Sequence, residues 1–237
     1  MVVAINGSWK VNVGHFFIKG LDAQKRKEML TSCITKLHAT GAILTSVTFD
    51  GVSANLSAMN LLGASLFRFP FPLTSFNHPV TGKPVLIILD VVHMIKLIRN
   101  TLGSKKVLID PDGNEIKWNY FQALEMLQDY LGGHFANRVT DLHINYYKKP
   151  MNVKLAVQLF SKSVADSMDH LLNRKVQQFI GCEATVKFVR ILNDVTDILN
   201  SRNLNHHNFK KPMSQMNHEE VIAKLDEAYN YIKQIKI

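Results

Sequence analysis

The sequence is short of cysteine and of long apolar runs. Cys33 and Cys182 are the only cysteines in 237 residues, too few for a disulfide framework, so a reducing compartment is favoured. No apolar run reaches the ~18 residues that a membrane-spanning helix needs. The N-terminal segment MVVAINGSWK lacks a basic stretch followed by an apolar one, so we expect no signal peptide. These absences argue against a disulfide-rich secreted domain and against a membrane partner.

Several ligand-binding motifs are also missing. No segment has the G-x-x-x-x-G-K-S/T spacing of a P-loop. The cysteines and histidines show neither C-x-x-C nor H-x-x-x-H spacing, so no zinc site is supported. The segment DPDGNE at 110–115 begins like a calcium-binding loop, but Phe121 stands where that loop needs its glutamate. We therefore interpret 110–115 as a hairpin turn.

Acidic residues are fewer than basic ones. Lys and Arg number 28 against 19 Asp and Glu, which gives a formal charge of +9 and a pI near 9.5. This excess favours a polyanionic partner, nucleic acid before an anionic membrane surface, although a solvated basic surface gives the same count. Hydrophobic residues at 46% and charged residues at 20% are enough to build a buried core.

The first hundred residues alternate between strand and helix patterns, which predicts a mixed α/β sheet layered with helices. A turn at Asn6-Gly7 separates two short strands within 1–19. The following elements are expected, in order, as a helix at 22–39 capped by Asp22, a strand at 42–50, a helix at 53–62, a loop at 64–83, a strand at 84–90 and a helix at 91–102.

The pattern changes after Gly103. A hairpin is expected over 107–118, around Asp112-Gly113. The remainder is helical in pattern, with helices expected at 118–131, 152–173, 183–203 and 217–235 and polar loops at 132–150 and 204–216. We therefore expect two domains, an α/β part at 1–103 and a mostly helical part at 104–237.

The segment PVLIILDVVHMIKLIRN at 84–100 carries the sharpest chemical signal. Its apolar strand ends on Asp90. Many enzymes present a metal-binding carboxylate at the end of a strand in this way, although Asp is also a favoured helix cap. His93 lies one helical turn after Asp90. It either faces the same site or is a core or surface histidine without a role in it. Asp50 ends the preceding strand in the same way, and Gly51 makes a simple turn equally reasonable.

The segment FVRILNDVTDILNSRN at 188–203 places polar groups on one helix face. Asp194, Asp197 and Ser201 are spaced three and four residues apart, so they share that face. A carboxylate there could accept hydrogen bonds from the N–H groups of a guanine edge. A solvated helix face has the same pattern, and spacing alone does not separate the two interpretations.

Five segments together resemble the P-element transposase family, including its vertebrate THAP-domain relatives. They match the family in order and spacing over nearly the whole chain, and the pairing of D-x-x-H-x-I-K-L-I-R-N with a later DILNSRN is specific. The segments are SWKV at 8–11, TFDGVSAN at 48–55, LDVVHMIKLIRN at 89–100, VKLAVQLFSKSVADSM at 153–168 and FVRILNDVTDILNSRN at 188–203.

This resemblance implies a fold and a set of site residues. The fold is an RNase H-like mixed sheet, present in part, followed by a mostly helical insertion that binds GTP. Asp90 falls on a catalytic, metal-binding carboxylate. GTP contacts fall on Arg138, where the family usually has Lys, and on Val153, Asp197 and Asn200, with Asp197 reading the guanine. Thr196 stands where the family has an aromatic residue that stacks on the base.

The resemblance also implies an activity and its partners. The parent chemistry is Mg²⁺-dependent DNA strand cleavage and transfer at a two-metal site, in the nucleus, on transposon ends, by a homo-oligomer that uses GTP as a cofactor. The family's first catalytic Asp precedes SWKV and its last Glu follows the insertion, so we expect this chain to be catalytically incomplete by itself. The alternative is a domesticated, non-catalytic protein that binds nucleotide or nucleic acid.

Overall fold

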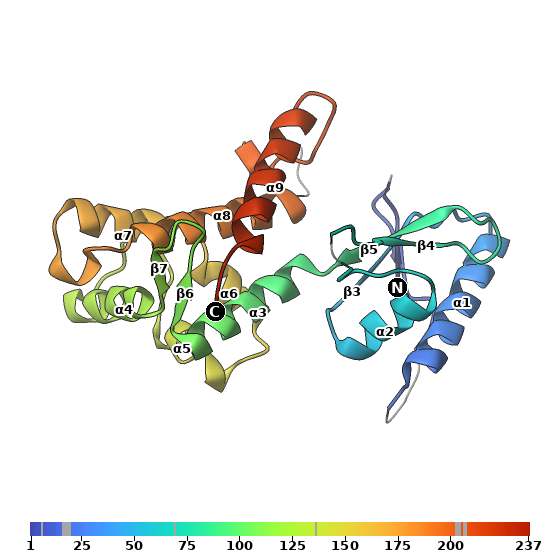
Figure 1. The fold of residues 1–237 in the computed structure, drawn as a ribbon, viewed down its shortest axis with the longest axis horizontal. Coiled ribbons are helices and arrows are strands. Elements are labelled where there is room, and N and C mark those ends of the chain that lie inside the picture. Colours follow the sequence, from blue (N-terminus) through green and yellow to red (C-terminus); the bar gives the residue numbers. More distant parts are fainter. Residues whose placement is uncertain (6, 16–19, 69, 136, 202–204, 206–207) are drawn as a thin grey trace. The chain divides into compact units, whose positions relative to one another are not determined.

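A computed structural model describes residues 1–5, 7–15, 20–68, 70–135, 137–201, 205 and 208–237. The chain divides into two compact units, Met1–Asp90 and Val91–Ile237, and both are visible in Figure 1. Each unit is described by itself below. No helix among the described residues is both long and apolar enough to cross a membrane.

A three-stranded mixed sheet is the centre of the first unit. Its order is β3 (Ser46–Phe49), β5 (Pro84–Leu89), β4 (Ser75–Asn77), with β3 parallel and β4 antiparallel to β5. The mixed sheet and β5 are as the sequence predicts, whereas β3 begins at Ser46 instead of 42. β4 lies in the segment expected to be a loop. Its three residues are too few to show a period of two, and buried Phe76 anchors the strand to the core.

Two helices and a small ribbon complete this unit. Helix α1 (Ala23–Ala39) begins as predicted, because Asp22 Oδ1 accepts a hydrogen bond from Lys25 N at 2.8 Å. Helix α2 (Ser53–Leu61) is preceded by Val52, so Ser53 is its first helical residue and not its cap. The expected N-terminal strands are β1 (Val2–Val3) and β2 (Lys10–Val11), paired antiparallel. The turn residue at position 6 and residues 16–19 lie outside the described residues.

The second unit is mostly helical, as the sequence predicts. It begins with α3 (Val91–Lys105) and the expected hairpin of β6 (Val107–Ile109) and β7 (Glu115–Lys117). Its other elements are α4 (Asn119–Leu131), α5 (Asp141–Ile144), the 3-10 helix η1 (Tyr146–Lys148), α6 (Val153–Leu159), α7 (Lys162–Asn173), the 3-10 helix η2 (Gln177–Phe179), α8 (Glu183–Leu199), the 3-10 helix η3 (Asn208–Lys210) and α9 (His218–Lys233).

Some expectations about this unit are wrong. The single helix expected at 152–173 is two helices, α6 and α7. The loop expected at 132–150 contains α5 and η1, the loop expected at 204–216 contains η3, and the helix expected at 183–203 ends at Leu199. The break falls at Phe160, the C-cap of α6, whose buried ring packs edge-on against both Phe121 and Phe188. The local sequence pattern does not show these contacts.

Helix α3 belongs to the second unit, because it packs against α6 and α8. The units consequently divide between Asp90 and Val91, whereas the sequence pattern puts the division at 103. Gly103 lies inside α3, where a Cβ atom would come within 3.0 Å of Tyr146 Cδ1 and closer still to two other ring atoms. The glycine that looks like a boundary is therefore a packing position for Tyr146.

Candidate functional site

Two aspartates lie at one edge of the mixed sheet. Asp50 follows β3 and Asp90 follows β5, and these neighbouring strands are parallel with Phe49 opposite Leu89. The main-chain N of Asp90 also donates to Phe49 O at 2.9 Å, which continues the ladder to the strand ends. Carboxyl ends of parallel strands meet at the same sheet edge, where ligand sites commonly form. Both side chains are partly buried.

Asp50 is held by a chain of side-chain hydrogen bonds. Its Oδ1 accepts from Asn55 Nδ2 at 2.7 Å, and Asn55 Oδ1 accepts from Arg26 Nη1 at 2.9 Å. Arg26 Nε in turn donates to Leu21 O at 3.2 Å. Helices α1 and α2 thus fix the orientation of a carboxylate that sequence spacing left as either a turn residue or a ligand. Helix α2 has no side-chain cap, so Asp50 does not cap it.

The fit of this edge to a metal ion is partial. Two carboxylates on adjacent strands are suitable oxygen ligands for Mg²⁺. In the described ranges, however, no group of three or more His, Cys, Asp or Glu side chains is arranged to hold a metal ion. The edge therefore offers part of a ligand set for a metal ion.

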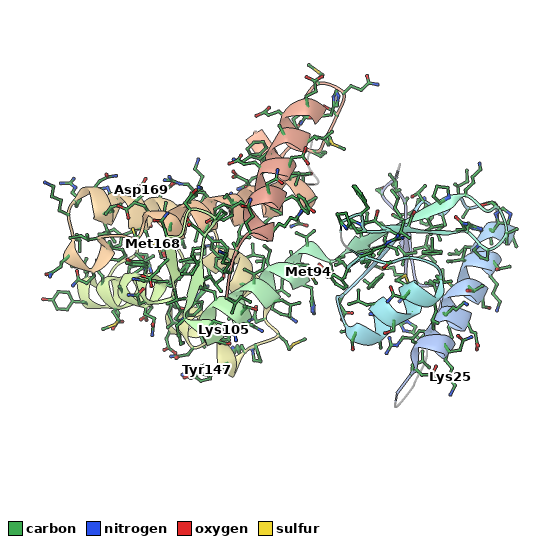
Figure 2. The ribbon with its side chains drawn as sticks, in the orientation of Figure 1. Lys25, Met94, Lys105, Tyr147, Met168 and Asp169 are labelled. Atoms are coloured by element: carbon green, nitrogen blue, oxygen red, sulfur yellow. The ribbon has the colours of Figure 1, made fainter. Side chains whose placement is uncertain are left out.

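The basic residues Lys96 and Arg99 of the 84–100 segment belong to the second unit. Lys96 and Arg99 are buried on α3, at 3% and 0% exposure. Lys96 Nζ lies 3.3 Å from His93 Nε2 and 3.5 Å from Met151 Sδ. Figure 2 labels Met94 near the start of α3, Lys105 at its end and Tyr147 in the segment that follows α5. The buried face of α3 thus contacts the segment just before α6.

The polar face of α8 splits into two parts. Asp197 Oδ2 accepts from Asn193 Nδ2 at 3.0 Å and lies 4.0 Å from Lys210 Nζ, and the Asp197 side chain is 23% exposed. Asp194 instead pairs with Lys224 of α9 at 3.4 Å. Ser201 lies beyond Asn200, the C-cap of α8, and its Oγ donates to Ile198 O at 2.9 Å. Of the three predicted face residues, Asp194 and Asp197 lie within α8, with side chains that are 25% and 23% exposed.

Other proposed nucleotide contacts lie on separate elements. Asn200 is the exposed C-cap of α8, one turn beyond Asp197. Val153 is the half-buried first residue of α6, and Arg138 is exposed in the segment between α4 and α5. Thr196 is buried, and its Oγ1 donates to Leu192 O at 2.7 Å, so it faces the core and not a bound base.

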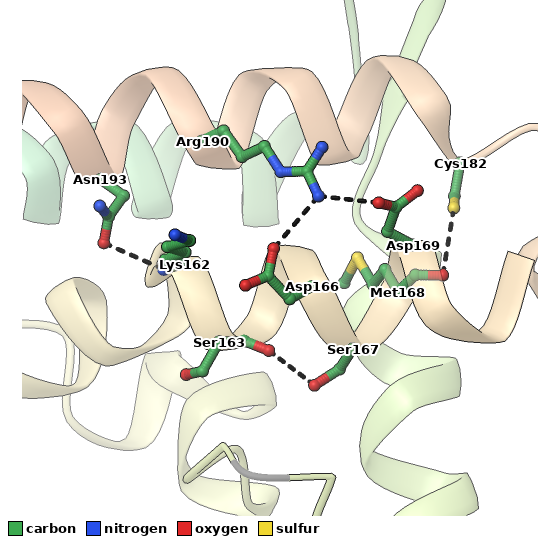
Figure 3. A network of polar contacts seen from close by, with 9 residues as sticks. All are labelled: Lys162, Ser163, Asp166, Ser167, Met168, Asp169, Cys182, Arg190 and Asn193. Atoms are coloured by element: carbon green, nitrogen blue, oxygen red, sulfur yellow. Dashed lines mark hydrogen bonds and ion pairs between the residues drawn. The ribbon is translucent and has the colours of Figure 1, made fainter. Parts of the chain in front are cut away.

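Polar contacts between α7 and α8 hold this helix face in place (Figure 3). Arg190 Nη2 contacts Asp166 Oδ1 at 3.1 Å and Asp169 Oδ2 at 2.8 Å. Asn193 Oδ1 accepts from the main-chain N of Lys162 at 2.9 Å, at the start of α7. Since Asn193 also bonds Asp197, the position of Asp197 is tied to α7.

Two buried titratable groups, His143 and Cys182, lie outside the predicted sites. His143 Nδ1 accepts from Thr140 N at 3.1 Å and its Nε2 lies 3.3 Å from Gln158 Oε1, and burial lowers the pKa of His143. Burial likewise raises the pKa of Cys182 to about 11. Neither sits in a motif of recognisable spacing. Both are structural, because His143 forms a capping box with Thr140 and Cys182 is fully enclosed in the core.

A small mixed sheet followed by a helical domain is the arrangement of an RNase H-type unit that leads into an insertion domain. Family models agree with this division. Residues 1–63 match the TNP-like RNase H N-terminal domain, and residues 92–212 match the TNP-like GTP-binding insertion domain. The second match covers more than half of the 237 residues, so the chain belongs to the TNP-like family of GTP-binding insertion domains. Its start at 92 adjoins the division between the two compact units.

Individual relatives agree with this assignment. The human DNA transposase THAP9 is 28% identical over 230 residues, which is 94% of this chain and 25% of that protein. The Drosophila P element transposase strand transfer complex matches with a TM-score of 0.77 at 24% identity, over 94% of this chain and 49% of that one. The chain thus spans about a quarter of the former and half of the latter. The predicted family resemblance and fold class are confirmed.

Proposed function

We propose that the second unit binds a guanine nucleotide, with Asp197 as the residue that recognises the base. The observation that carries this proposal is the fixed position of Asp197, which Asn193 and Lys210 hold at the end of α8. A carboxylate accepts up to about four hydrogen bonds, so a side chain held in this way can accept from the N1–H and N2–H groups of guanine. Membership of the GTP-binding insertion family supports the same ligand.

The remaining contacts follow from the chemistry of each residue. Asn200, one turn beyond Asp197, offers an amide to the base or ribose. Val153 offers apolar contact to the base plane, and the exposed guanidinium of Arg138 offers a bidentate partner for phosphate oxygens. Buried Thr196 supplies no stacking surface. Edge recognition through Asp197 therefore supplies the selectivity for guanine.

The first unit would supply part of a DNA-processing site. In this proposal Asp90 is the catalytic, Mg²⁺-binding carboxylate of a P-element-like transposase, and Asp50 on the adjacent strand end is its neighbour. The basic excess of the chain suits a DNA partner such as a transposon end in the nucleus. A homo-oligomer belongs to the same proposal.

The chain by itself is not expected to cleave DNA. Two metal ions about 4 Å apart need several converging carboxylates, and Asp50 and Asp90 are the two that β3 and β5 bring to this edge. A nuclease assay on a transposon-end duplex with Mg²⁺ tests this expectation. Cleavage abolished by Asp90→Asn would contradict it, and GTP binding without cleavage would agree with a domesticated, non-catalytic nucleotide-binding protein.

The base-recognition role is tested by nucleotide titration of matched variants. Asp197→Asn replaces a guanine-reading carboxylate with an amide, so the preference for GTP over ATP should be lost. Asp194→Asn makes the same change one turn away, at a residue paired with Lys224, and should keep the preference. Unchanged guanine preference in Asp197→Asn would remove Asp197 from the site.

A further inference from the structure

One face of α3 holds three consecutive residues just before α6. Arg99 Nη2 donates to Pro150 O at 2.7 Å, and Arg99 Nη1 donates to Asn152 O at 3.2 Å. Between them, Met151 Sδ lies 3.5 Å from Lys96 Nζ. Lys96 and Arg99 are three residues apart and therefore share this face. The α3 face thus contacts residues 150, 151 and 152 in turn.

The Arg99 side chain is held in one position by its surroundings. The side chain is fully buried, its Nε and Nη2 both donate to Asn100 Oδ1, and its guanidinium lies 5.3 Å from the centroid of the Tyr146 ring. Its guanidinium also donates to the main-chain carbonyls of Pro150 and Asn152, in the segment that leads into α6. A planar guanidinium holds several acceptors in one geometry, which a lysine ammonium cannot reproduce.

The segment that Arg99 holds sets the start of α6. Asn152 is the N-cap of this helix, and its Oδ1 accepts from Leu155 N at 3.2 Å. Helix α6 has only seven residues, and helices this short are marginal without outside anchors. Val153, its first residue, is also a contact in the proposed nucleotide site. The position of Val153 therefore depends on groups donated by α3.

We propose that Arg99, assisted by Lys96, is a positioning residue of the guanine-nucleotide site. It acts through the main chain at 150–152 and so fixes Val153 at the start of α6, without touching the nucleotide. This inference rests on the proposed function. It also assigns the two basic residues of the IKLIRN segment to nucleotide binding and separates them from the Asp50 and Asp90 edge.

Titration of the full chain with GTP and with ATP tests the proposal. Arg99→Lys keeps the charge but loses the two-carbonyl geometry, so the affinity for GTP should fall about tenfold. The GTP/ATP affinity ratio should fall with it, while the number of sites per folded molecule stays unchanged. Arg174→Lys is the matched control, because Arg174 is an exposed residue at the end of α7 that has no part in the proposed site, and this variant should bind GTP as the unmodified chain does.

The outcomes separate the two proposals. No guanine nucleotide binding by the unmodified chain would overturn the proposed function and the positioning role with it. Tight, selective binding by the unmodified chain and by Arg99→Lys alike would overturn the positioning role alone. If the Arg99→Lys variant does not fold, the Lys96→Met variant is titrated with GTP and ATP in its place. A lower affinity for GTP and a lower GTP/ATP affinity ratio in Lys96→Met would support the positioning role. Values equal to those of the unmodified chain would overturn it.

Discussion

Asn193 hydrogen-bonds Asp197 across one turn of α8, with Nδ2 donating to Oδ2 at 3.0 Å. The same amide uses Oδ1 to accept from Lys162 N, the first helical residue of α7. Ser161, the residue before it, provides no side-chain cap. Asn193 therefore caps a neighbouring helix and positions the proposed guanine-reading carboxylate with one side chain.

A pair of variants separates these two roles of Asn193. Asn193→Ala loses both bonds, so the free energy of unfolding in urea should fall by roughly 1 kcal/mol and GTP affinity should weaken. Asn193→Asp keeps an acceptor for Lys162 N but places a second negative charge beside Asp197. It should therefore retain more of the stability while still weakening GTP binding. Equal stability and equal GTP affinity in all three proteins would contradict both roles.

Gly103 is predicted to be intolerant of a side chain. Gly103→Ala forces a methyl group into the Tyr146 ring, which itself packs on Trp118 and Arg99, and should lower the free energy of unfolding by roughly 1–3 kcal/mol. Gly133→Ala is the control, since its Cβ would meet no atom within 4 Å. Denaturant titration of the two variants measures the difference, and equal midpoints would show that α3 and Tyr146 do not pack this closely.

His143 makes stability depend on pH. Burial lowers its pKa below the ordinary 6.5, so the unfolded chain binds a proton more readily than the folded one. Stability from this group is therefore full above pH ~6.5 and is lost as pH falls towards its folded pKa, with a slope of at most about 1.4 kcal/mol per pH unit. Thermal unfolding from pH 7.5 to 5 measures this loss.

Variants identify the group responsible. His143→Gln keeps a side chain suited to the capping box but does not titrate, so its stability should fall less steeply on acidification. His170→Gln changes an exposed histidine and should leave the slope as it is. Identical slopes for His143→Gln and the unmodified protein would remove His143 as the origin.

The two cysteines should differ in reactivity. The thiolate is the reactive form, and burial raises the pKa of Cys182 to about 11, so alkylation there is suppressed near neutral pH. Cys33 is partly exposed and should be modified first. Mass spectrometry after timed treatment with iodoacetamide measures the order. Equal rates in the folded protein would show that the core around Cys182 opens readily.

Some parts of this molecule were predictable because their cause is local. The strand at β5 and the helix at α3 follow from an apolar run and a helical stripe, and the cap at Asp22 follows from residue type. The break at Phe160 was not predictable, and the contacts of its ring with Phe121 and Phe188 do not show in the local sequence pattern. Partners of Arg99 are main-chain carbonyls 51 and 53 residues away, which leave no pattern in the sequence.

The candidate sites divide in the same way. Asp90 and Asp197 were candidates because of their positions at a strand end and on a helix face, and the family resemblance, not their spacing, assigned their roles. The pairing of Asp50 with Asp90 needed the parallel register of β3 and β5. The separate roles of Asp194 and Asp197 needed the position of α9, whose Lys224 pairs with Asp194 alone of the two. Spacing on one helix face cannot reveal which partner arrives from another helix.

Titration of the purified chain with GTP and with ATP, with the heat of binding measured by calorimetry, tests most directly whether its helical unit binds guanine nucleotide. We expect saturable binding of GTP and at least about tenfold weaker binding of ATP, since adenine lacks the N–H pattern that a carboxylate reads. No heat of binding with GTP, or equal affinity for both nucleotides, would contradict it.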